Sequence, residues 1–209
     1  HDDVKNALNS SQNKIASLMS KFTKNLEERI SKLHEECENV TKMANDPKLS
    51  DPKTTIQEAA NILVVVIALT DELSKLSKDY NHYQEVMNLQ KTKFDDINNL
   101  VNDVKIKQLL WETKTLWENE TKKWFSVNFN SIDPNLLIDK VGEYKNNTKI
   151  AATELPENPA ADDLLSTITD FANLLPVVED LKNPALQQTH QDQIEILLGE
   201  KIFGSLILA

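Results

Sequence analysis

The stretch from Ala59 to Val104 restricts the fold more than any other part of the sequence. Starting at Ala59, alternating steps of three and four residues meet an apolar side chain each time, except at Gln90. This spacing places one apolar stripe on one face of a helix. Neither Gly nor Pro interrupts the interval. The pattern predicts one continuous helix of roughly 50 residues, about 75 Å long at 1.5 Å per residue. The stripe comprises Ile62, Val66, Leu69, Leu73, Leu76, Tyr80, Tyr83, Met87, Phe94, Ile97, Val101 and Val104.

Two interpretations of this stripe remain open. It is either the spine of a helical bundle within the chain or one strand of a coiled coil with another chain. The segment before it, from about Val4 to Met43, carries a second apolar stripe and predicts another helix. The connector from Ala44 to Thr54 contains two Asp-Pro pairs, which disfavour helix. Helix restarts at Asp51-Pro52 or at Thr55, which has capping-box spacing to Glu58.

The second half of the sequence predicts shorter helices separated by proline. After Val104 the apolar stripe shifts, and this helix is expected to end near Ser126. Asp133-Pro134 reads as an N-cap followed by proline in the first turn, opening a helix that stops before Pro156. Further helices are expected from Ala161 to Leu175, where Pro176 ends or kinks the helix, and from Ala185 to Leu198. Asn183 would cap this last helix, Gly199 would end it, and a short apolar tail follows Gly204.

Composition agrees with an all-α fold. Only 3 of the 209 residues are Gly and 7 are Pro, too few for the turns of a sheet protein. We therefore expect an elongated helical bundle with one very long helix, followed by short, proline-separated helices. The net charge of -10 argues against nucleic acid, anionic membranes and the acidic microtubule surface as direct partners.

No residue pattern predicts catalysis or cofactor binding. The chain has no Gly-rich phosphate loop, and Cys37 is its only cysteine. His34 and Cys37 are half of a metal site at most, and we interpret them as a solvated His beside a buried thiol. Acidic pairs such as Asp95-Asp96 are interpreted as charged helical faces or first turns. We therefore predict no catalytic residue, no metal and no cofactor.

Three tryptophans fall in one short window. Trp111, Trp117 and Trp124 are candidate packing or interface anchors. In the simpler interpretation they are core anchors where helix layers meet. In the alternative, one or two of them face a partner, because Trp buries a large area at low entropy cost.

From this window onward the sequence resembles the opening of the dynein heavy chain linker. The resemblance begins with Leu110-Trp111, Trp117 and Trp124 and continues through Phe129-x-x-Ile132-Asp133 and Val141-x-x-Tyr144-Lys145. Its most specific part is Leu174-Leu175-Pro176-Val177-Val178, then Asp180-Leu181-Lys182-Asn183-Pro184-Ala185-Leu186, then His190 and Ile194. It covers roughly Val104 to Phe203. On this basis Pro176, Asn183, Pro184 and His190 join the tryptophans as candidate packing or interface anchors.

The resemblance, rather than the composition, implies a role and a domain division. Residues 1–104 would form a helical bundle of the tail or neck, and residues 105–209 the N-terminal part of the linker. The segment would be non-catalytic and would transmit force between the tail and an AAA+ motor ring, in a cilium or flagellum axoneme. Expected partners are the ring of the same heavy chain, neighbouring dynein chains, and intermediate or light chains. The alternatives are a cytoplasmic or intraflagellar-transport heavy chain and a motor-free helical tether in the cytoplasm.

Overall fold

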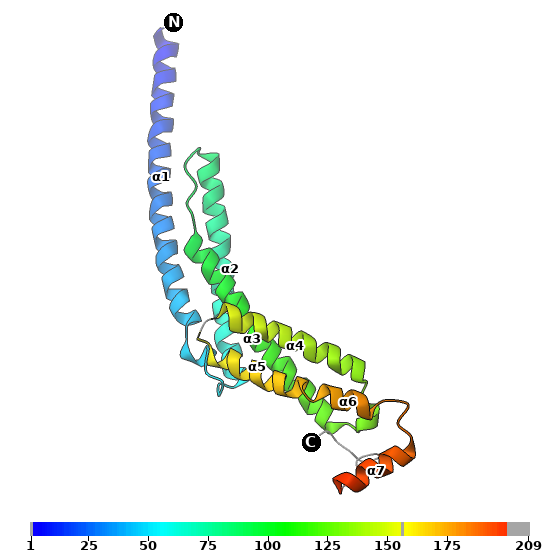
Figure 1. Cartoon of the computed structure of the whole chain (residues 1–209). Helices are drawn as coiled ribbons and strands as arrows, with labels where there is room; N and C mark the ends of the chain where they lie inside the picture. The colour runs from blue at the N-terminus through cyan, green and yellow to red at the C-terminus, as the bar shows by residue number, and fades with distance from the viewer. Residues whose placement is uncertain (1, 156, 200–209) are drawn as a thin grey trace. The chain divides into compact units, whose positions relative to one another are not determined.

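The computed structural model describes residues 2–155 and 157–199, and its regular elements in this part of the chain are helices joined by turns and short extended segments. The helices in order are α1 (Asp2–Ala44), α2 (Ile56–Val86), α3 (Asp95–Ser126), α4 (Pro134–Glu154), α5 (Pro159–Ala172), α6 (Leu175–Leu181) and α7 (Gln188–Leu198). Two short 3-10 helices, Pro47–Leu49 and Phe129–Ser131, lie in the connectors (Figure 1). The predicted all-α fold is confirmed. Pro156 and the apolar tail after Gly204 lie outside the described residues.

The chain divides into two compact units. The first contains residues 1–45 and 64–104, and the second contains residues 46–63 and 105–209. Helices α2 and α3 therefore contribute residues to both units. The longest helix is α1, with 43 residues, and it belongs to the first unit.

Contacts between side chains fix the helix directions in the first unit. Phe22 of α1 meets Tyr83 of α2 with ring centroids 6.4 Å apart. Farther along α1, Val40 lines the same surface hollow as Leu73 of α2. Positions thus rise along α1 as they fall along α2, so the two helices are antiparallel. The predicted stripe of α1 is buried only from Leu26 onward, whereas Ile15, Leu18 and Phe22 are exposed. The buried side chains of α1 are Leu26, Ile30, Leu33, Cys37, Val40 and Ala44.

The predicted single helix from Ala59 to Val104 is wrong. Helix α2 ends at Val86, the chain reverses, and α3 begins at Asp95 (Figure 1). The ending is a Schellman motif: the Leu89 amide donates to the Gln84 carbonyl at 2.8 Å, and the Asn88 amide to the Glu85 carbonyl at 3.0 Å. Asn88 takes the left-handed conformation, with φ 52, which asparagine tolerates better than most residues.

A side chain secures the extended segment that follows this ending. The buried amide of Gln84 donates to the Thr92 hydroxyl and accepts from the Thr92 backbone N–H, both at 2.8 Å. These bonds replace helical hydrogen bonds that the chain gives up between Met87 and Phe94. The interval that was predicted to be one helix thus contains a reversal of the chain.

The buried face of α2 also differs from the predicted stripe. Ala59, Val66, Leu73 and Tyr80 are buried as expected, whereas Tyr83 is exposed. The other buried residues on this face of α2 are Leu63 and the polar residues Thr70, Ser77 and Gln84. A small hydroxyl residue can face a helical core when it bonds back to its own helix, as Ser77 does to the Ser74 carbonyl at 2.9 Å.

The helix starts of the second unit follow the capping chemistry of the sequence. Thr55 and Glu58 form the predicted capping box before α2, with the Glu58 amide donating to the Thr55 hydroxyl at 3.3 Å. Asp133 Oδ1 accepts from the amides of Asn135 and Leu136, and α4 runs from Pro134 to Glu154 as predicted.

The short helices after α4 differ from the prediction in their bounds. Helix α5 runs from Pro159, capped by Asn158, and ends at Ala172 rather than Leu175. Pro176 then lies in the first turn of a separate helix, α6, because proline is tolerated where the backbone N–H has no helical partner. Helix α4 packs on both α5 and α6. Gly199 ends α7 with φ 72, as predicted.

Candidate functional site

An aromatic cluster connects three helices of the second unit. Trp117 of α3 is buried and makes edge-to-face contacts with Phe171 of α5 at 5.3 Å, Trp124 at 6.0 Å and Tyr144 of α4 at 6.1 Å. Phe171 also stacks on Trp124 at 5.7 Å. Edge-to-face and offset-stacked rings are the preferred aromatic arrangements. The cluster therefore joins α3, α4 and α5 through one side chain.

Trp111 lies six residues before Trp117 in α3 and makes a different set of contacts. Its ring is buried, and its Nε1 donates to the Leu49 carbonyl at 3.2 Å. Lys114 lies over the same ring, 4.7 Å from the centroid, and donates to the Pro52 carbonyl at 2.9 Å. The Ala160 amide donates to the Ser50 carbonyl at 3.0 Å. The connector before α2 is thereby fastened to both α3 and α5.

The candidate anchors near the end of the chain are all exposed, unlike Trp111 and Trp117. Asn183 does not cap the last helix: its Oδ1 accepts from the Ala185 amide at 2.9 Å in a turn. Helix α7 begins at Gln188 instead, where His190 Nδ1 accepts from the Gln187 amide at 3.2 Å in a capping box. Pro184 lies in the turn between α6 and α7. The structure thus gives these residues local roles and does not bring them into the aromatic cluster.

Lys182 is a residue that sequence analysis quoted in a motif but did not select. Its Nζ donates to the Asn130 carbonyl at 2.8 Å and lies 5.3 Å from the centroid of the Phe129 ring. The end of α6 is thereby attached to the 3-10 turn that precedes α4. In the sequence, the only feature that pointed to this contact of Lys182 was its basic character just before Asn183-Pro184.

A shallow hollow of about 230 Å³ lies beside the cluster, lined in part by Trp124, Val127, Ile132 and Leu136. Trp124 is half-buried, and Val127 and Leu136 are exposed. Glu120 lies on the rim, where a hydrogen bond from Lys123 at 2.8 Å lowers the pKa of its carboxyl group. The hollow is open to solvent, and its lining combines apolar side chains with the charged side chains of Glu120, Asp133 and Lys140.

His34 and Cys37, the pair considered as half of a metal site, make other interactions in the structure. His34 Nδ1 lies 2.6 Å from Asp96 Oδ2, and its ring stacks on Phe94 at 5.5 Å. Burial is the largest single effect and opposes ionisation of Asp96, but the hydrogen bonds from His34 and from the backbone amides of Ile97 and Asp96 together outweigh it, so the pKa of this carboxyl is lowered. Burial and the nearby Asp96 raise the pKa of the Cys37 thiol. Among residues 2–155 and 157–199, no group of three His, Cys, Asp or Glu side chains is placed to hold a metal.

Within residues 2–155 and 157–199, none of the helices combines the length and the apolar character that crossing a membrane requires.

Comparison with known proteins identifies relatives along nearly the whole chain. Dynein axonemal heavy chain 6 of Homo sapiens is 27% identical over 192 residues, which are 92% of this chain and 5% of the relative. Dynein axonemal heavy chain 8 of Mus musculus is 23% identical over 188 residues, 90% of this chain and 4% of the relative. Dynein axonemal heavy chain 2 of Homo sapiens is 22% identical over 143 residues, 68% of this chain and 3% of the relative. The chain thus spans a small fraction of the length of these proteins.

The family match falls on the part of the chain that contains the aromatic cluster. Residues 97–206 match the family described as dynein heavy chain, N-terminal region 2. This range begins at the first turn of α3 and includes α4, α5, α6 and α7. It also includes every residue that carried the resemblance between Leu110 and Ile194. The chain therefore belongs to the dynein heavy chain family, as part of its N-terminal region.

Proposed function

We propose that this chain is a non-catalytic mechanical segment of an axonemal dynein heavy chain, linking the tail to the AAA+ motor ring and transmitting force between them. The observation that carries the proposal is the family match over residues 97–206. The axonemal relatives favour a ciliary or flagellar location over a cytoplasmic one. The chain itself contributes no nucleotide chemistry in this proposal; ATP turnover belongs to a ring elsewhere in the heavy chain, which would make the whole protein a microtubule motor.

The proposed division places a tail bundle at residues 1–104 and the start of the linker at 105–209. It is supported by the family match, which begins at residue 97, within α3 and close to the proposed boundary. Partners of the two parts would be proteins: the AAA+ ring for the linker, and intermediate, light or neighbouring heavy chains for the tail. The exposed anchors Pro176, Asn183, Pro184 and His190 are candidates for such contacts.

Packing within the second unit, rather than one long helix, supports the proposed mechanical role. The start of α4 is fixed by Asp133 and that of α5 by Asn158, and proline occupies the first turn of each. The Trp117 cluster then holds α3, α4 and α5 together. Because caps, prolines and interlocked rings set the angles between short helices, load would pass through this body with little bending.

The test uses a full-length heavy chain that carries this segment. Phe171→Ala weakens the aromatic cluster without touching any nucleotide-binding element. If the segment transmits force, the variant retains ATP hydrolysis while microtubule gliding slows. Leu197→Ala, at a position that is 85% exposed, serves as the control and leaves gliding unchanged. Unchanged gliding in Phe171→Ala, with the cluster shown to be loosened, would contradict force transmission.

Two further observations separate the alternatives. A fluorescently tagged heavy chain is expected along the axoneme of a ciliated cell, and accumulation in the cell body alone would favour the cytoplasmic alternative. The purified chain of 209 residues is expected to hydrolyse no ATP. Measurable turnover by it would overturn the non-catalytic assignment.

A further inference from the structure

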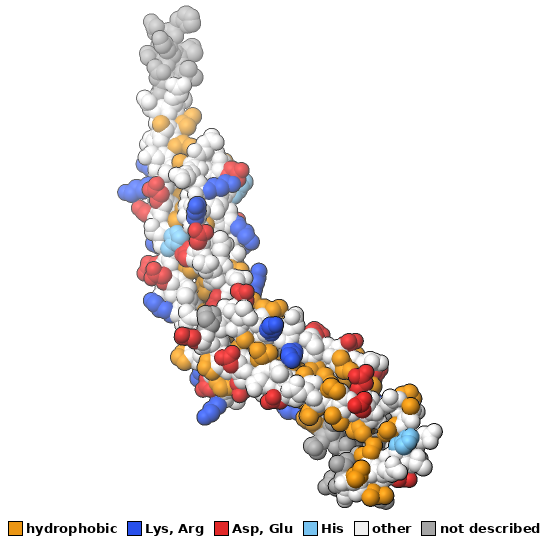
Figure 2. Space-filling model, viewed as in Figure 1, with side chains coloured by type: hydrophobic (Ala, Val, Ile, Leu, Met, Phe, Trp, Pro, Cys, Tyr) orange, Lys and Arg blue, Asp and Glu red, His pale blue; other side chains and the backbone are white. Residues whose placement is uncertain are grey.

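Helix α1 exposes an apolar face between Ile15 and Phe22, within the first unit. Ile15, Leu18, Met19 and Phe22 are 61%, 65%, 44% and 50% exposed. Their spacing of three, four and seven residues puts them on one side of the helix. Leu26, on the same side one turn later, is buried. The stripe therefore continues past the point where the fold covers it, and apolar side chains are visible along this part of α1 (Figure 2).

The antiparallel register of α1 and α2 explains why α2 does not cover the apolar face of α1 before Phe22. Phe22 lies opposite Tyr83 in the antiparallel pair, and α2 ends at Val86, three residues later. The end of α2 is therefore level with about Met19, and Leu18 and Ile15 lie beyond it. Helix α1 extends past the turn between α2 and α3 (Figure 1). A helix from another protein could pack against α1 in the space beyond the end of α2, along the continuation of the α2 axis.

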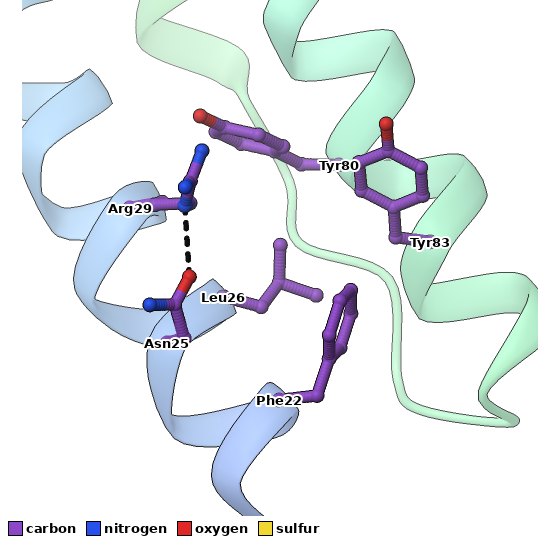
Figure 3. A pocket seen from close by; sticks show the side chains of 6 residues that line it. All are labelled: Phe22, Asn25, Leu26, Arg29, Tyr80 and Tyr83. Atoms are coloured by element: carbon purple, nitrogen blue, oxygen red, sulfur yellow. Dashed lines mark hydrogen bonds between the residues drawn. The ribbon is translucent and has the colours of Figure 1, made fainter. Parts of the chain in front are cut away.

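A groove begins where this exposed face meets α2. It has a volume of about 350 Å³ and is lined by Phe22, Asn25, Leu26, Arg29, Tyr80 and Tyr83 (Figure 3). Its apolar lining comes mainly from Phe22, Leu26 and the two tyrosine rings. Asn25 Oδ1 accepts from Arg29 Nε at 2.8 Å, which holds the guanidinium group at the edge. The groove offers a pocket for a large apolar side chain next to a fixed cation.

The charge of this region is opposite to that of the whole chain. Residues 10–29 contain Lys14, Lys21, Lys24 and Arg29 against Glu27 and Glu28, so they carry a net charge of +2, although the chain carries a net charge of -10. Lys14 lies four residues before Leu18 and Lys21 three after it, so both are its neighbours on the helix surface. All three lysines are exposed. The apolar face is thus flanked by positive charge.

We infer that this face and groove dock an acidic amphipathic helix of a partner protein. Helix-in-groove recognition uses apolar anchors at i, i+3, i+4 and i+7, the spacing that the exposed stripe presents. Acidic side chains on the partner would face Lys14, Lys21 and Arg29. A second copy of the chain fits less well, because a two-fold contact through this face would oppose the same lysines to one another. The inference does not depend on force transmission.

The test measures binding of a designed helical peptide to the complete chain. The probe has about 18 residues, with leucines on one face and glutamates beside them. A matched peptide carries lysine at each glutamate position. We expect the acidic peptide to bind at least about tenfold more tightly in fluorescence anisotropy, and the difference to shrink as salt is added.

Matched variants locate the contact. Leu18→Ser is expected to weaken acidic-peptide binding by about tenfold. Val64→Ser, equally exposed at 65% on α2, leaves it unchanged. The double variant Lys14→Glu/Lys21→Glu also weakens binding, whereas Lys75→Glu/Lys78→Glu makes the same charge change elsewhere in the unit and has no effect. Circular dichroism checks that each variant keeps its helical content.

Several results would overturn the inference. Equal binding of the acidic and basic peptides would remove the role of charge. Loss of binding in Val64→Ser as well as in Leu18→Ser would place the contact elsewhere. A dimer that dissociates in Leu18→Ser would assign the face to a second copy. Sedimentation with anionic phospholipid vesicles, lost in the same variant, would assign it to a membrane.

Discussion

Replacing Trp117 should destabilise the second unit more than any change at a neighbouring position. The ring is 5% exposed and makes edge-to-face contacts with Phe171, Trp124 and Tyr144. Burying a Trp side chain removes about 150–250 Å² from water, worth about 4–6 kcal/mol at 25 cal/mol per Å². Truncations of buried aromatic residues to Ala cost about 3–5 kcal/mol. We expect Trp117→Ala to lower the free energy of unfolding by about 4 kcal/mol.

The positions of the tryptophans allow the stability of the second unit to be measured separately from that of the first. All 3 tryptophans of the chain lie in the second unit, so denaturant unfolding followed by tryptophan fluorescence reports on it alone. Trp111 and Trp124 keep the signal in the variant. Trp117→Phe, which retains one ring, should lose about 1–2 kcal/mol.

The control for Trp117→Ala is its neighbour in the same helix. Leu116 is 50% exposed, so Leu116→Ala should cost about 1 kcal/mol or less. A loss in Trp117→Ala no larger than that in Leu116→Ala would refute the view that the cluster holds this unit together.

Three further predictions concern single side chains. Asp133→Ala removes the cap of α4 and should lower the free energy of unfolding by about 1 kcal/mol in the fluorescence assay, whereas Asp139→Ala should have little effect. The pKa of Glu58 is lowered to about 2, first by hydrogen bonds from Thr55 and then by Lys48. Its contribution to stability should therefore be complete above pH 4.5, the ordinary pKa, and disappear as the pH falls through about 2, so that Glu58→Gln and the parent chain converge in acid. Burial raises the pKa of Cys37, so its thiol should react slowly with an aromatic disulfide reagent until denaturant is added.

Each of these three predictions has a result that contradicts it. Equal losses in Asp133→Ala and Asp139→Ala would mean that the cap adds nothing. A constant difference between Glu58→Gln and the parent chain from neutral pH to pH 2 would exclude the capping carboxylate as the titrating group. Immediate modification of Cys37 in the folded chain would show that the thiol is accessible.

Local capping chemistry explains which helix boundaries could be predicted from the sequence. Asp133-Pro134, the pair Thr55 and Glu58, and Gly199 each satisfy backbone groups within a few residues, so their roles do not depend on the rest of the fold. The Schellman ending at Asn88 has the same local character. It was missed because the periodic apolar pattern outweighed it, although Asn is the usual alternative to Gly at that position.

The aromatic cluster could be predicted only in part. The window of Trp111 to Trp124 identified the residues, but the partners of Trp117 come from α4 and α5 and depend on how those helices return to α3. The same limit applies to the core of α2. Thr70 and Ser77 are polar, and their burial follows from the face that α1 and α3 cover rather than from hydropathy.

The hydrogen bond from Trp111 to the Leu49 carbonyl has a practical consequence for anyone labelling this protein. Connectors between helices are the usual places for an affinity tag, a fluorophore or a protease site, because such insertions rarely disturb a fold there. The segment before α2 is an exception, since its carbonyl groups at Leu49, Ser50 and Pro52 bond to Trp111, Ala160 and Lys114. An insertion there would detach the connector from two helices at once.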